Sequence, residues 1–451
     1  MCLLWVFLRS NRSMPKQAGP EFESWGRYPV THSRVVPLNW TTDFPAIKIE
    51  TEKCLPAGMG RSYGDVCLLD GGTLLLTPGM DRFYEFNAET GLLRCEAGVT
   101  LARILEFAVP RGWFLPVSPG TKYVTIGGAI ANDIHGKNHH VAGTFGNHVL
   151  RFELVRSDGT RFICSPEENA EWYRATIGGM GLTGLITWAE VQLKPIVSRK
   201  IIYGGTQFKG IDEFLALTRA AQHIEYTVAW IDCVSRGRNF ARGIFMQGDH
   251  SDRPEPLKVA SGPRVTFPFD LPGFVLNRAS IALFNTAYFH KQFGKHTESL
   301  MDYEPFFFPL DAVLHWNRMY GSRGLLQFQC VVPWSADNRG IVSILDTIAK
   351  SGLASFLAVL KVFGEVPSRG MMSFPAPGIT LALDFPIKPD KSFALFERLG
   401  AMVVELGGRM YPAKDARMSA REFQAFYPQW RDFSAYVDPR FSSDFWKRVT
   451  K

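Results

Sequence analysis

The chain has 451 residues, 46% of them hydrophobic and 21% charged, so it is long enough for two or more globular domains. Its net charge of +7 comes from Lys and Arg spread along the chain without a basic block. This argues against nucleic-acid binding and leaves an acidic substrate or an anionic membrane surface open. The seven cysteines include no CxxC pair and are typical of a reducing compartment.

The first thirteen residues, MCLLWVFLRSNRS, begin with eight apolar residues whose charge follows them, and no small-residue cleavage site appears. A secretory signal peptide has the opposite order, and no apolar run reaches the roughly 18–20 residues of a membrane span. We therefore expect a cytoplasmic protein or one held peripherally at the inner membrane. Met14 offers a second start, and the sequence leaves open whether residues 1–13 are translated.

From Trp25 to Pro195, short β-rich runs alternate with Gly, Pro and Asp turns, which predicts an α+β cofactor domain. The expected elements are one amphipathic helix, 101–109, and strands at 72–77, 92–97, 149–155 and 184–193.

After about Val197, strands rich in aromatic and β-branched residues alternate with helices, which predicts a substrate domain with an antiparallel sheet and helices on one face. A Pro- and Gly-rich apolar stretch, 248–276, is long enough to predict a lid or a disordered loop. The expected strands are 226–233, 242–246, 325–332, 355–363 and 379–385, and the expected helices are 341–351 and 391–404.

Three glycine-rich segments, 57–65, 119–149 and 178–184, predict a cofactor that lies extended across a domain. Glycine lets the backbone approach a bound group closely and point amide N–H groups at it, as a pyrophosphate requires. Neither of the two outer segments ends in the Gly-Lys-Ser/Thr of a Walker A loop. The third contains a GxGxxG, but no acidic residue follows about twenty positions later, so that match alone is weak.

The motifs GRSYGD (60–65), PGTKYVTIGGAIANDIHGKNHH (119–140) and GGMGLTG (178–184) together resemble the vanillyl-alcohol-oxidase family of FAD flavoproteins, and within it the decaprenylphosphoryl-β-D-ribose 2′-oxidases. From about Trp25 onward, nearly the whole chain shares the resemblance. Its shorter motifs are WNRMY (316–320), LQFQ (326–329), LKVFG (360–364), DFPIK (384–388) and YPAKDAR (411–417).

The resemblance implies an α+β fold with a two-subdomain, PCMH-type FAD-binding domain at 1–197. A substrate domain, 198–407, would follow, and a C-terminal segment, 408–451, would return to close the FAD domain over the flavin.

FAD is the cofactor that this family implies, with its pyrophosphate held by backbone amides and hydroxyls. Arg61 stands where related alditol and aldonolactone oxidases often carry a histidine that bonds to the flavin, so we expect non-covalent FAD. The residues expected to contact FAD are Ala57, Gly58, Met59, Gly60, Arg61, Ser62, Tyr63, Gly64, Asp65, Gly120, Thr121, Thr125, Ile126, Gly127, Gly128, Asn132, Asp133, Ile134, His135, Gly184, Leu185 and Tyr411.

Lys414 is the leading catalytic candidate, and His135 is the second. Oxidation of a secondary alcohol needs a hydride acceptor and removal of a hydroxyl proton. A lysine beside the flavin offsets developing negative charge, and a lowered pKa would let it act as a base. The alternative for Lys414 is an ordinary surface lysine.

Two glutamines on one expected strand, Gln327 and Gln329, point to the same face because side chains two residues apart do so. Two amides suit a sugar with several hydroxyls; the alternative is a polar face of an edge strand. By resemblance, the substrate residues are Tyr63, Lys137, Trp230, Gln327, Gln329, Lys361 and Thr380, with Tyr320 nearby.

The sequence departs from the family at three pocket positions. Thr380 and Ala382 stand where the family has Asn and Cys, and Phe307 stands where it has Tyr. A thiol has no evident role in hydride transfer, so the loss of the cysteine weakens the substrate assignment only slightly.

The cluster of His135, His139 and His140 lies in a glycine-rich loop without a cysteine to complete a ligand set, so we expect no metal. His139 and His140 are as well explained by structural roles. Asp133, two residues before His135, is predicted to hold a ring N–H and fix its tautomer.

We expect an FAD-dependent oxidoreductase that converts the 2-hydroxyl of a polyprenyl-phospho-β-D-ribofuranose to a ketone. A short-chain dehydrogenase would then act on the keto product, giving the arabinose precursor for cell walls. The alternative is an aldonolactone or alditol oxidase acting on a free sugar; a flavin-binding protein without turnover is a third class. The lipid tail, the electron acceptor and the oligomeric state remain open.

Overall fold

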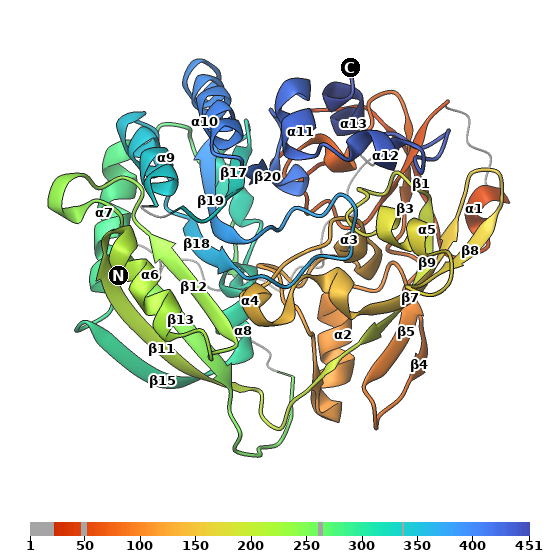
Figure 1. Ribbon diagram of the computed structural model, residues 1–451, viewed down its shortest axis with the longest axis horizontal. Helices are drawn as coiled ribbons and strands as arrows, with labels where there is room; N and C mark the ends of the chain where they lie inside the picture. Colours follow the sequence, from red (N-terminus) through yellow and green to blue (C-terminus); the bar gives the residue numbers. More distant parts are fainter. Residues whose placement is uncertain (1–21, 47–51, 260–264, 336–337) are drawn as a thin grey trace.

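The computed structural model describes residues 22–46, 52–259, 265–335 and 338–451, and its strands form two separate halves (Figure 1). The extension at residues 1–13 lies outside the described residues. Among the helices of the described ranges, none has the length and apolar content needed to cross a bilayer.

The first half is built on two sheets, with α2 (Leu101–Ala108) packed beside them (Figure 1). A parallel sheet has the order β1-β3-β2, and an antiparallel sheet has the order β4-β5-β9-β7-β8. Its strands are β1 (Arg34–Pro37), β2 (Cys54–Ala57), β3 (Thr73–Leu76), β4 (Phe83–Phe86), β5 (Leu92–Glu96), β7 (Val149–Val155), β8 (Arg161–Cys164) and β9 (Leu185–Gln192).

The strands of this half were predictable from short apolar runs between turns, and β5 also shows alternating burial. In β5, Leu93 and Cys95 are fully buried whereas Leu92 and Arg94 are partly exposed, the period of two that a strand imposes. The helix α2 begins after Thr100, whose side chain accepts a hydrogen bond from the Arg103 amide at 3.3 Å. The four expected strands and the expected helix agree with the structure to within one residue at each end.

The second half is an eight-stranded sheet, antiparallel throughout, with the order β15-β11-β13-β12-β18-β19-β17-β20. Its strands are β11 (Lys200–Lys209), β12 (Tyr226–Ile231), β13 (Arg242–His250), β15 (His296–Asp302), β17 (Leu325–Val332), β18 (Ala358–Phe363), β19 (Gly378–Pro386) and β20 (Arg409–Met410).

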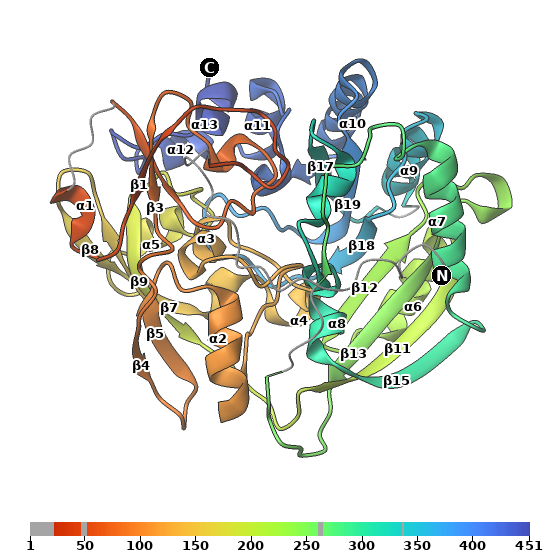
Figure 2. The same cartoon turned by 180° about the vertical axis from the view of Figure 1, so that it is seen from behind.

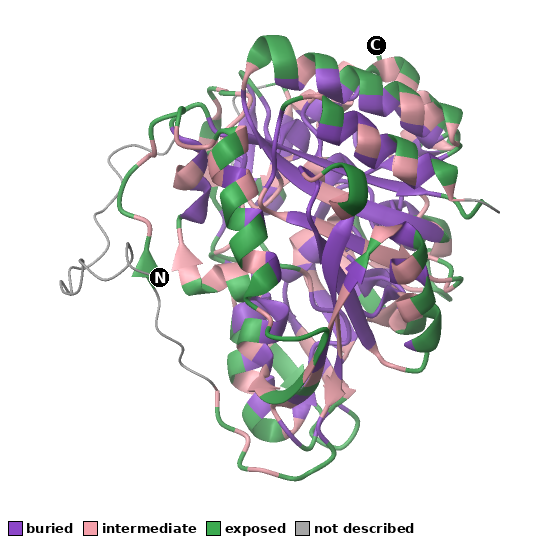
Figure 3. Cartoon of the chain, turned by 90° about the vertical axis from the view of Figure 1, so that its left-hand side faces the viewer, coloured by how far each residue is buried: buried purple, intermediate pink, exposed green. Residues whose placement is uncertain are grey.

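Three helices, α6 (Gly210–Ala220), α9 (Arg339–Lys350) and α10 (Ala394–Glu405), cover one face of this sheet, as predicted (Figure 1). The outward-facing residues of these helices are exposed, whereas the residues that face the sheet and most of the strands behind them are buried (Figure 3). A fourth helix, α7 (Arg278–His290), lies on the opposite face, where Phe289 packs against Trp230 and Ile244 (Figure 2). The prediction of helices on one face was therefore incomplete.

The long apolar stretch at 248–276 is more regular than predicted where the structure describes it. β13 extends to His250, and β14 (Val265–Thr266) pairs in parallel with β16 (Val313–Leu314). Residues 260–264 of the stretch lie outside the described residues, and its role as a lid stays a prediction.

The C-terminal residues connect the two halves. β20 pairs with β17 of the large sheet, and then Ala413 accepts a hydrogen bond from the Tyr63 amide at 2.9 Å. In the last helix, Arg448 forms ion pairs with Asp65 at 2.8 Å and Asp415 at 2.9 Å.

The remaining elements are α1 (Asp43–Ala46), α3 (Ile126–Ala131), α4 (His139–Ala142), α5 (Ala170–Thr176), α8 (Tyr303–Phe307), α11 (Ala420–Phe426), α12 (Trp430–Ser434), α13 (Asp444–Val449), β6 (Trp113–Phe114) and β10 (Lys194–Pro195).

Candidate active site

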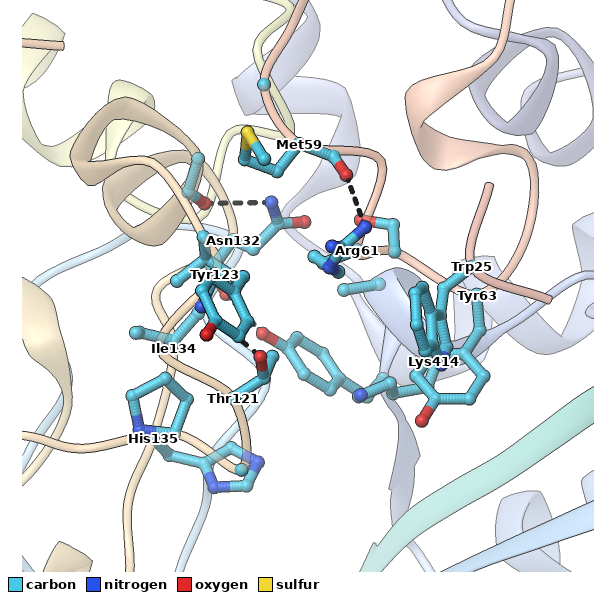
Figure 4. Close-up of a pocket in the computed structure, with 18 of the residues that line it drawn as sticks. Trp25, Met59, Arg61, Tyr63, Thr121, Tyr123, Asn132, Ile134, His135 and Lys414 are labelled. Carbon is cyan, nitrogen blue, oxygen red and sulfur yellow. Dashed lines mark hydrogen bonds between the residues drawn. The ribbon is translucent and has the colours of Figure 1, made fainter. Parts of the chain in front are cut away.

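A cavity of about 670 Å³ is lined by residues of both halves. Its size lies within the roughly 300–1,000 Å³ of ligand pockets. One wall carries Thr121, Asn132 and His135, and the wall facing it carries Arg61 and Lys414 (Figure 4). The cavity thus lies between the glycine-rich turns and the face of the large sheet opposite α6, α9 and α10.

At the glycine-rich end, the first two glycine segments pack directly on each other. Thr125 caps α3 by accepting a hydrogen bond from the Gly128 amide at 3.1 Å. A Cβ on Gly58 would lie 2.5 Å from the Thr125 hydroxyl, so any larger residue there would force the two turns apart. Both turns therefore present backbone to the cavity.

The same end has unfilled capacity for a polar group. The Ser118 hydroxyl is buried and lines the cavity, and among the described residues it has no hydrogen-bond partner. A Cβ added at Gly120 would meet nothing within 4 Å. Because buried polar groups are normally hydrogen-bonded, these features fit a bound ligand with hydrogen-bonding oxygens, as the phosphates of FAD have.

Arg61 lies flat against the cavity wall. Its guanidinium is 4.5 Å from the centre of the Trp25 ring and donates a hydrogen bond to the Met59 carbonyl at 2.9 Å. An arginine offers no route to a covalent flavin bond, so non-covalent binding stays our prediction.

At the other end, three half-buried lysines, Lys137, Lys361 and Lys414, lie in the cavity wall with His135. The Lys361 ammonium is 3.2 Å from His135 Nδ1, and Gln329 Nε2 is 2.9 Å from His135 Nε2. Burial, and then the charge of Lys361, holds the pKa of His135 well below its usual value. His135 is therefore a neutral imidazole with both ring nitrogens engaged.

The lysines of this group have unusual proton affinities. Burial lowers the pKa of Lys361 to about 7, with a smaller contribution from Lys414. Burial also lowers the pKa of Lys137 to about 7, helped by Lys361. Among the described residues, no carboxylate forms an ion pair with either lysine, so their charges are available to an anionic ligand.

Lys414 lies 4.1 Å from the centre of the Tyr63 ring and shares its surroundings with a buried carboxylate, Asp384 (Figure 4). Burial lowers the pKa of Lys414, and the charge of Asp384 raises it again. Burial raises the pKa of Asp384, which Gln327 and then Lys414 oppose. The carboxylate accepts a hydrogen bond from Gln327 on one oxygen, while its other oxygen has no partner in the described part of the chain.

The predicted role of Asp133 was wrong. Asp133 is fully buried and accepts hydrogen bonds from the Gly146 amide, at 2.9 Å, and from the Ser373 hydroxyl. It therefore anchors the loop behind the cavity, and the partners of the His135 ring are Lys361 and Gln329 instead.

Most predicted site residues line the cavity, including both catalytic candidates and the two glutamines of β17. A Cβ on Gly64 would lie 1.8 Å from the Asp415 carbonyl oxygen, and Asp65 is paired with Arg448. The predicted contact residues that do not line the cavity are Gly64, Asp65, Ile126, Asp133 and Thr380. Ile126 is in the core and Thr380 is buried behind Gln329.

Several lining residues were not predicted, and most of them lie outside the motifs; Tyr123 and Ala413 lie inside motifs but were not assigned to the cavity. Trp25 precedes the first motif, and Val313 and Leu314 belong to β16. The nearest motif to Val313 and Leu314 is WNRMY (316–320), which begins two residues after β16. The other unpredicted lining residues include Ser118, Tyr123, Met246, Tyr288, Leu310, Val359 and Ala413.

The two further histidines pack into the protein. The His139 ring centre is 4.5 Å from that of Phe363, and His140 Nε2 is 2.9 Å from the Ile224 carbonyl oxygen. Within the described residues, no three His, Cys, Asp or Glu side chains gather as metal ligands would.

Comparison with known families defines the class of protein. A model of the FAD binding domain family matches residues 47–165, the region that contributes both glycine-rich turns of the cavity. Together with the α+β fold, the cavity and a relative of 36% identity that covers 87% of the chain, this match makes the protein an FAD-dependent oxidoreductase.

The relatives extend the match along the chain. Decaprenylphosphoryl-β-D-ribose oxidase of Mycolicibacterium smegmatis is 36% identical over 408 residues, 87% of this chain and 88% of that protein. An uncharacterized protein encoded in the mprA 5′ region of Streptomyces coelicolor is 32% identical over 373 residues, 78% of this chain and 100% of that protein. A putative D-arabinono-1,4-lactone oxidase of Neurospora crassa is 31% identical over 140 residues, 31% of this chain and 24% of that protein. The chain belongs to the same flavoprotein family as the Mycolicibacterium oxidase.

Proposed function

We propose that this oxidoreductase oxidises the 2-hydroxyl of a polyprenyl-phospho-β-D-ribofuranose to a ketone. The similarity to an enzyme named for a decaprenylphosphoryl ribose, over 87% of the chain, supports this substrate class. The observation that carries the proposal is the polar wall of the large sheet, where Gln327, Gln329 and Lys361 line one cavity opposite His135. Amides and cations at this density suit a sugar that carries both hydroxyls and a phosphate.

Lys414 is the residue that we assign to the hydroxyl proton. Bound FAD supplies the hydride acceptor when it is present. Because burial lowers the pKa of Lys414, a useful fraction of it is a neutral amine that accepts the proton from the 2-hydroxyl. The resulting ammonium, beside the face of the Tyr63 ring, then offsets negative charge at the reacting end of the cavity.

His135 positions the substrate in this scheme. The Gln329 amide donates to His135 Nε2, so the proton of the neutral ring lies on Nδ1, where the neutral amine of Lys361 can accept it. These two contacts fix the orientation of the imidazole. Lys137 and Lys361, which have no carboxylate partner in the described ranges, are assigned to the anionic part of the substrate.

The keto product would require reduction from the opposite side to complete the epimerisation. A short-chain dehydrogenase is the partner that we propose for this step, because reduction of the ketone needs a hydride donor, such as a reduced nicotinamide, whereas the FAD bound here would take up the hydride.

Anaerobic stopped-flow bleaching of the flavin by a polyprenyl-phospho-ribose tests the proposal, with a free aldonolactone as the competing substrate. Bleaching by the lipid-linked sugar alone supports it. Bleaching by the free sugar alone would establish a lactone oxidase, the second candidate, which the partial similarity to the Neurospora protein favours. In the same preparation, acid precipitation should leave the yellow FAD in the supernatant, as a non-covalent cofactor requires.

A further inference from the structure

The outer face of α7 differs from the outer faces of the other helices on the large sheet. The outer face of α10 exposes Glu397, Arg398 and Glu405, the charged pattern of a solvated helix. On α7, Leu283 is 73% exposed and Phe284 is 46% exposed. The other exposed residues of α7 are Ala279, Thr286, Ala287 and His290, and none carries a carboxylate or an ammonium.

The segment before α7 exposes a further large apolar side chain. Phe274 is 77% exposed, and its carbonyl accepts a hydrogen bond from the Asn277 side chain at the start of the helix. We call Phe274, Leu283 and Phe284 the α7 patch. Soluble proteins expose single apolar side chains often, but neighbouring large ones usually mark an interaction site.

The α7 patch connects to the cavity through aromatic rings. The Phe284 ring centre is 6.0 Å from that of Tyr288, and the Tyr288 ring centre is 4.7 Å from that of Trp230. Tyr288 and Trp230 both line the cavity. An apolar chain leaving the cavity along these rings would reach the surface at the α7 patch.

The segment that carries the α7 patch has an excess of positive charge. From Leu271 to Thr297 the sequence contains no Asp or Glu, whereas it contains Arg278, Lys291 and Lys295, of which Lys295 pairs with Glu213 of α6 at 2.7 Å. Exposed apolar side chains on a segment with excess cations are typical of protein surfaces that lie on anionic lipid. A protein partner would not require this combination.

We propose that the α7 patch docks on an anionic phospholipid surface, so that the lipid tail of the substrate passes between that surface and the cavity along Phe284, Tyr288 and Trp230. The proposal rests on the proposed function for its substrate, but the docking itself is measured without substrate. It gives the protein a peripheral membrane contact through a helix that packs on the cavity side of the sheet.

Co-sedimentation of the FAD-loaded protein with vesicles of phosphatidylcholine and phosphatidylglycerol tests the docking. We expect the double variant Phe274→Glu/Leu283→Glu to bind about tenfold more weakly or worse, since two apolar contacts are replaced by like-charged ones. The matched control is Ile202→Glu/Leu300→Glu, a cross-strand pair on β11 and β15 that is 53% and 59% exposed. The control should bind vesicles as the unmodified protein does.

Three results would overturn the proposal. They are unmodified protein that stays in the supernatant, equal binding by both double variants, and a dimer in gel filtration that only the α7 variant loses. The last result would make the patch an interface between two copies of the chain.

A second measurement separates this proposal from the proposed function. Flavin bleaching by a short-tailed, water-soluble substrate analogue should be equally fast in both double variants. Bleaching by the long-tailed substrate in vesicles should be slowed only in the α7 variant. If neither substrate bleaches the unmodified protein, the proposed function fails while the vesicle result still decides the docking.

Discussion

The two faces of the eight-stranded sheet are made by the same strands and have opposite chemistry. Along β17, Leu326 and Phe328 face the helices α9 and α10, while Gln327 and Gln329 line the cavity. β18 repeats the arrangement, with Leu360 in the core and Lys361 beside His135. Two adjacent residues of one strand therefore have different roles: one packs in the core under the helices, and the next lines the cavity.

The first way to test this difference is to shorten adjacent side chains of β18. Leu360→Ala should lower the free energy of unfolding by about 2–5 kcal/mol, because a fully buried side chain leaves a cavity against the helices. Val359→Ala, on the cavity face, should cost less than about 1 kcal/mol. Urea unfolding of the FAD-loaded protein measures both, and equal losses would contradict the division of the faces.

Removal of the Lys414 side chain should slow the reaction but leave the fold and FAD binding intact. Lys414→Ala should slow flavin reduction by about 10²-fold or more, the scale of a missing acid–base group, while FAD stays bound by the glycine-rich turns. Stopped-flow reduction and the flavin absorbance spectrum measure the two effects. The control is Lys391→Ala, an exposed lysine outside the cavity; near-normal reduction in Lys414→Ala would remove this lysine from the mechanism.

Asp384 lies on the cavity face of β19 and should tune Lys414. Its negative charge raises the pKa of Lys414, so Asp384→Asn should lower that pKa further. If neutral Lys414 takes the proton, the rate of flavin reduction rises with pH through this pKa, and the rising limb should move to lower pH in the variant. Asp346→Asn, a surface change on α9, should leave the pH dependence of flavin reduction unchanged. An unchanged pH dependence in Asp384→Asn would show that Asp384 does not influence Lys414.

The smallest expected effect concerns the reactivity of cysteine thiols on the two faces of the sheet. Ala382 lines the cavity, and its cross-strand neighbourhood contains Cys330, which is fully buried on the helix side. In Ala382→Cys, an electrophilic thiol reagent should modify residue 382 and spare Cys330, with little effect on stability. Peptide mapping by mass spectrometry reads out both sites. An adduct within residues 380–384 of the unmodified protein would show that our alignment to the family is wrong.

Local pattern was sufficient for much of the fold and part of the site. The period of two placed Gln327 and Gln329 on one face, and the glycine-rich turns identified a cofactor cavity before any contact was known. The motif YPAKDAR pointed to Lys414, which the structure places in the cavity wall.

Contacts between distant residues were beyond the reach of the sequence. Asp133 is two residues from His135, yet Lys361, 226 residues away, is the group beside the ring. Spacing along the chain carries no information about such a contact, because the loop backbone turns the Asp133 side chain away from the cavity. For the same reason the sequence did not place α7 on the cavity face or show that Asp384 influences Lys414.

The contacts that residues 413–448 make with the first half of the chain affect when the cofactor can be enclosed. Lys414 and the Ala413 carbonyl that accepts a hydrogen bond from Tyr63 lie more than 340 residues after the first glycine-rich turn, and Arg448, later still, joins Asp65 to Asp415. During synthesis the glycine-rich turns leave the ribosome long before these residues do. The cavity wall can therefore close only after these later residues have left the ribosome, so that FAD is enclosed at a later stage than the synthesis of the turns that contact it.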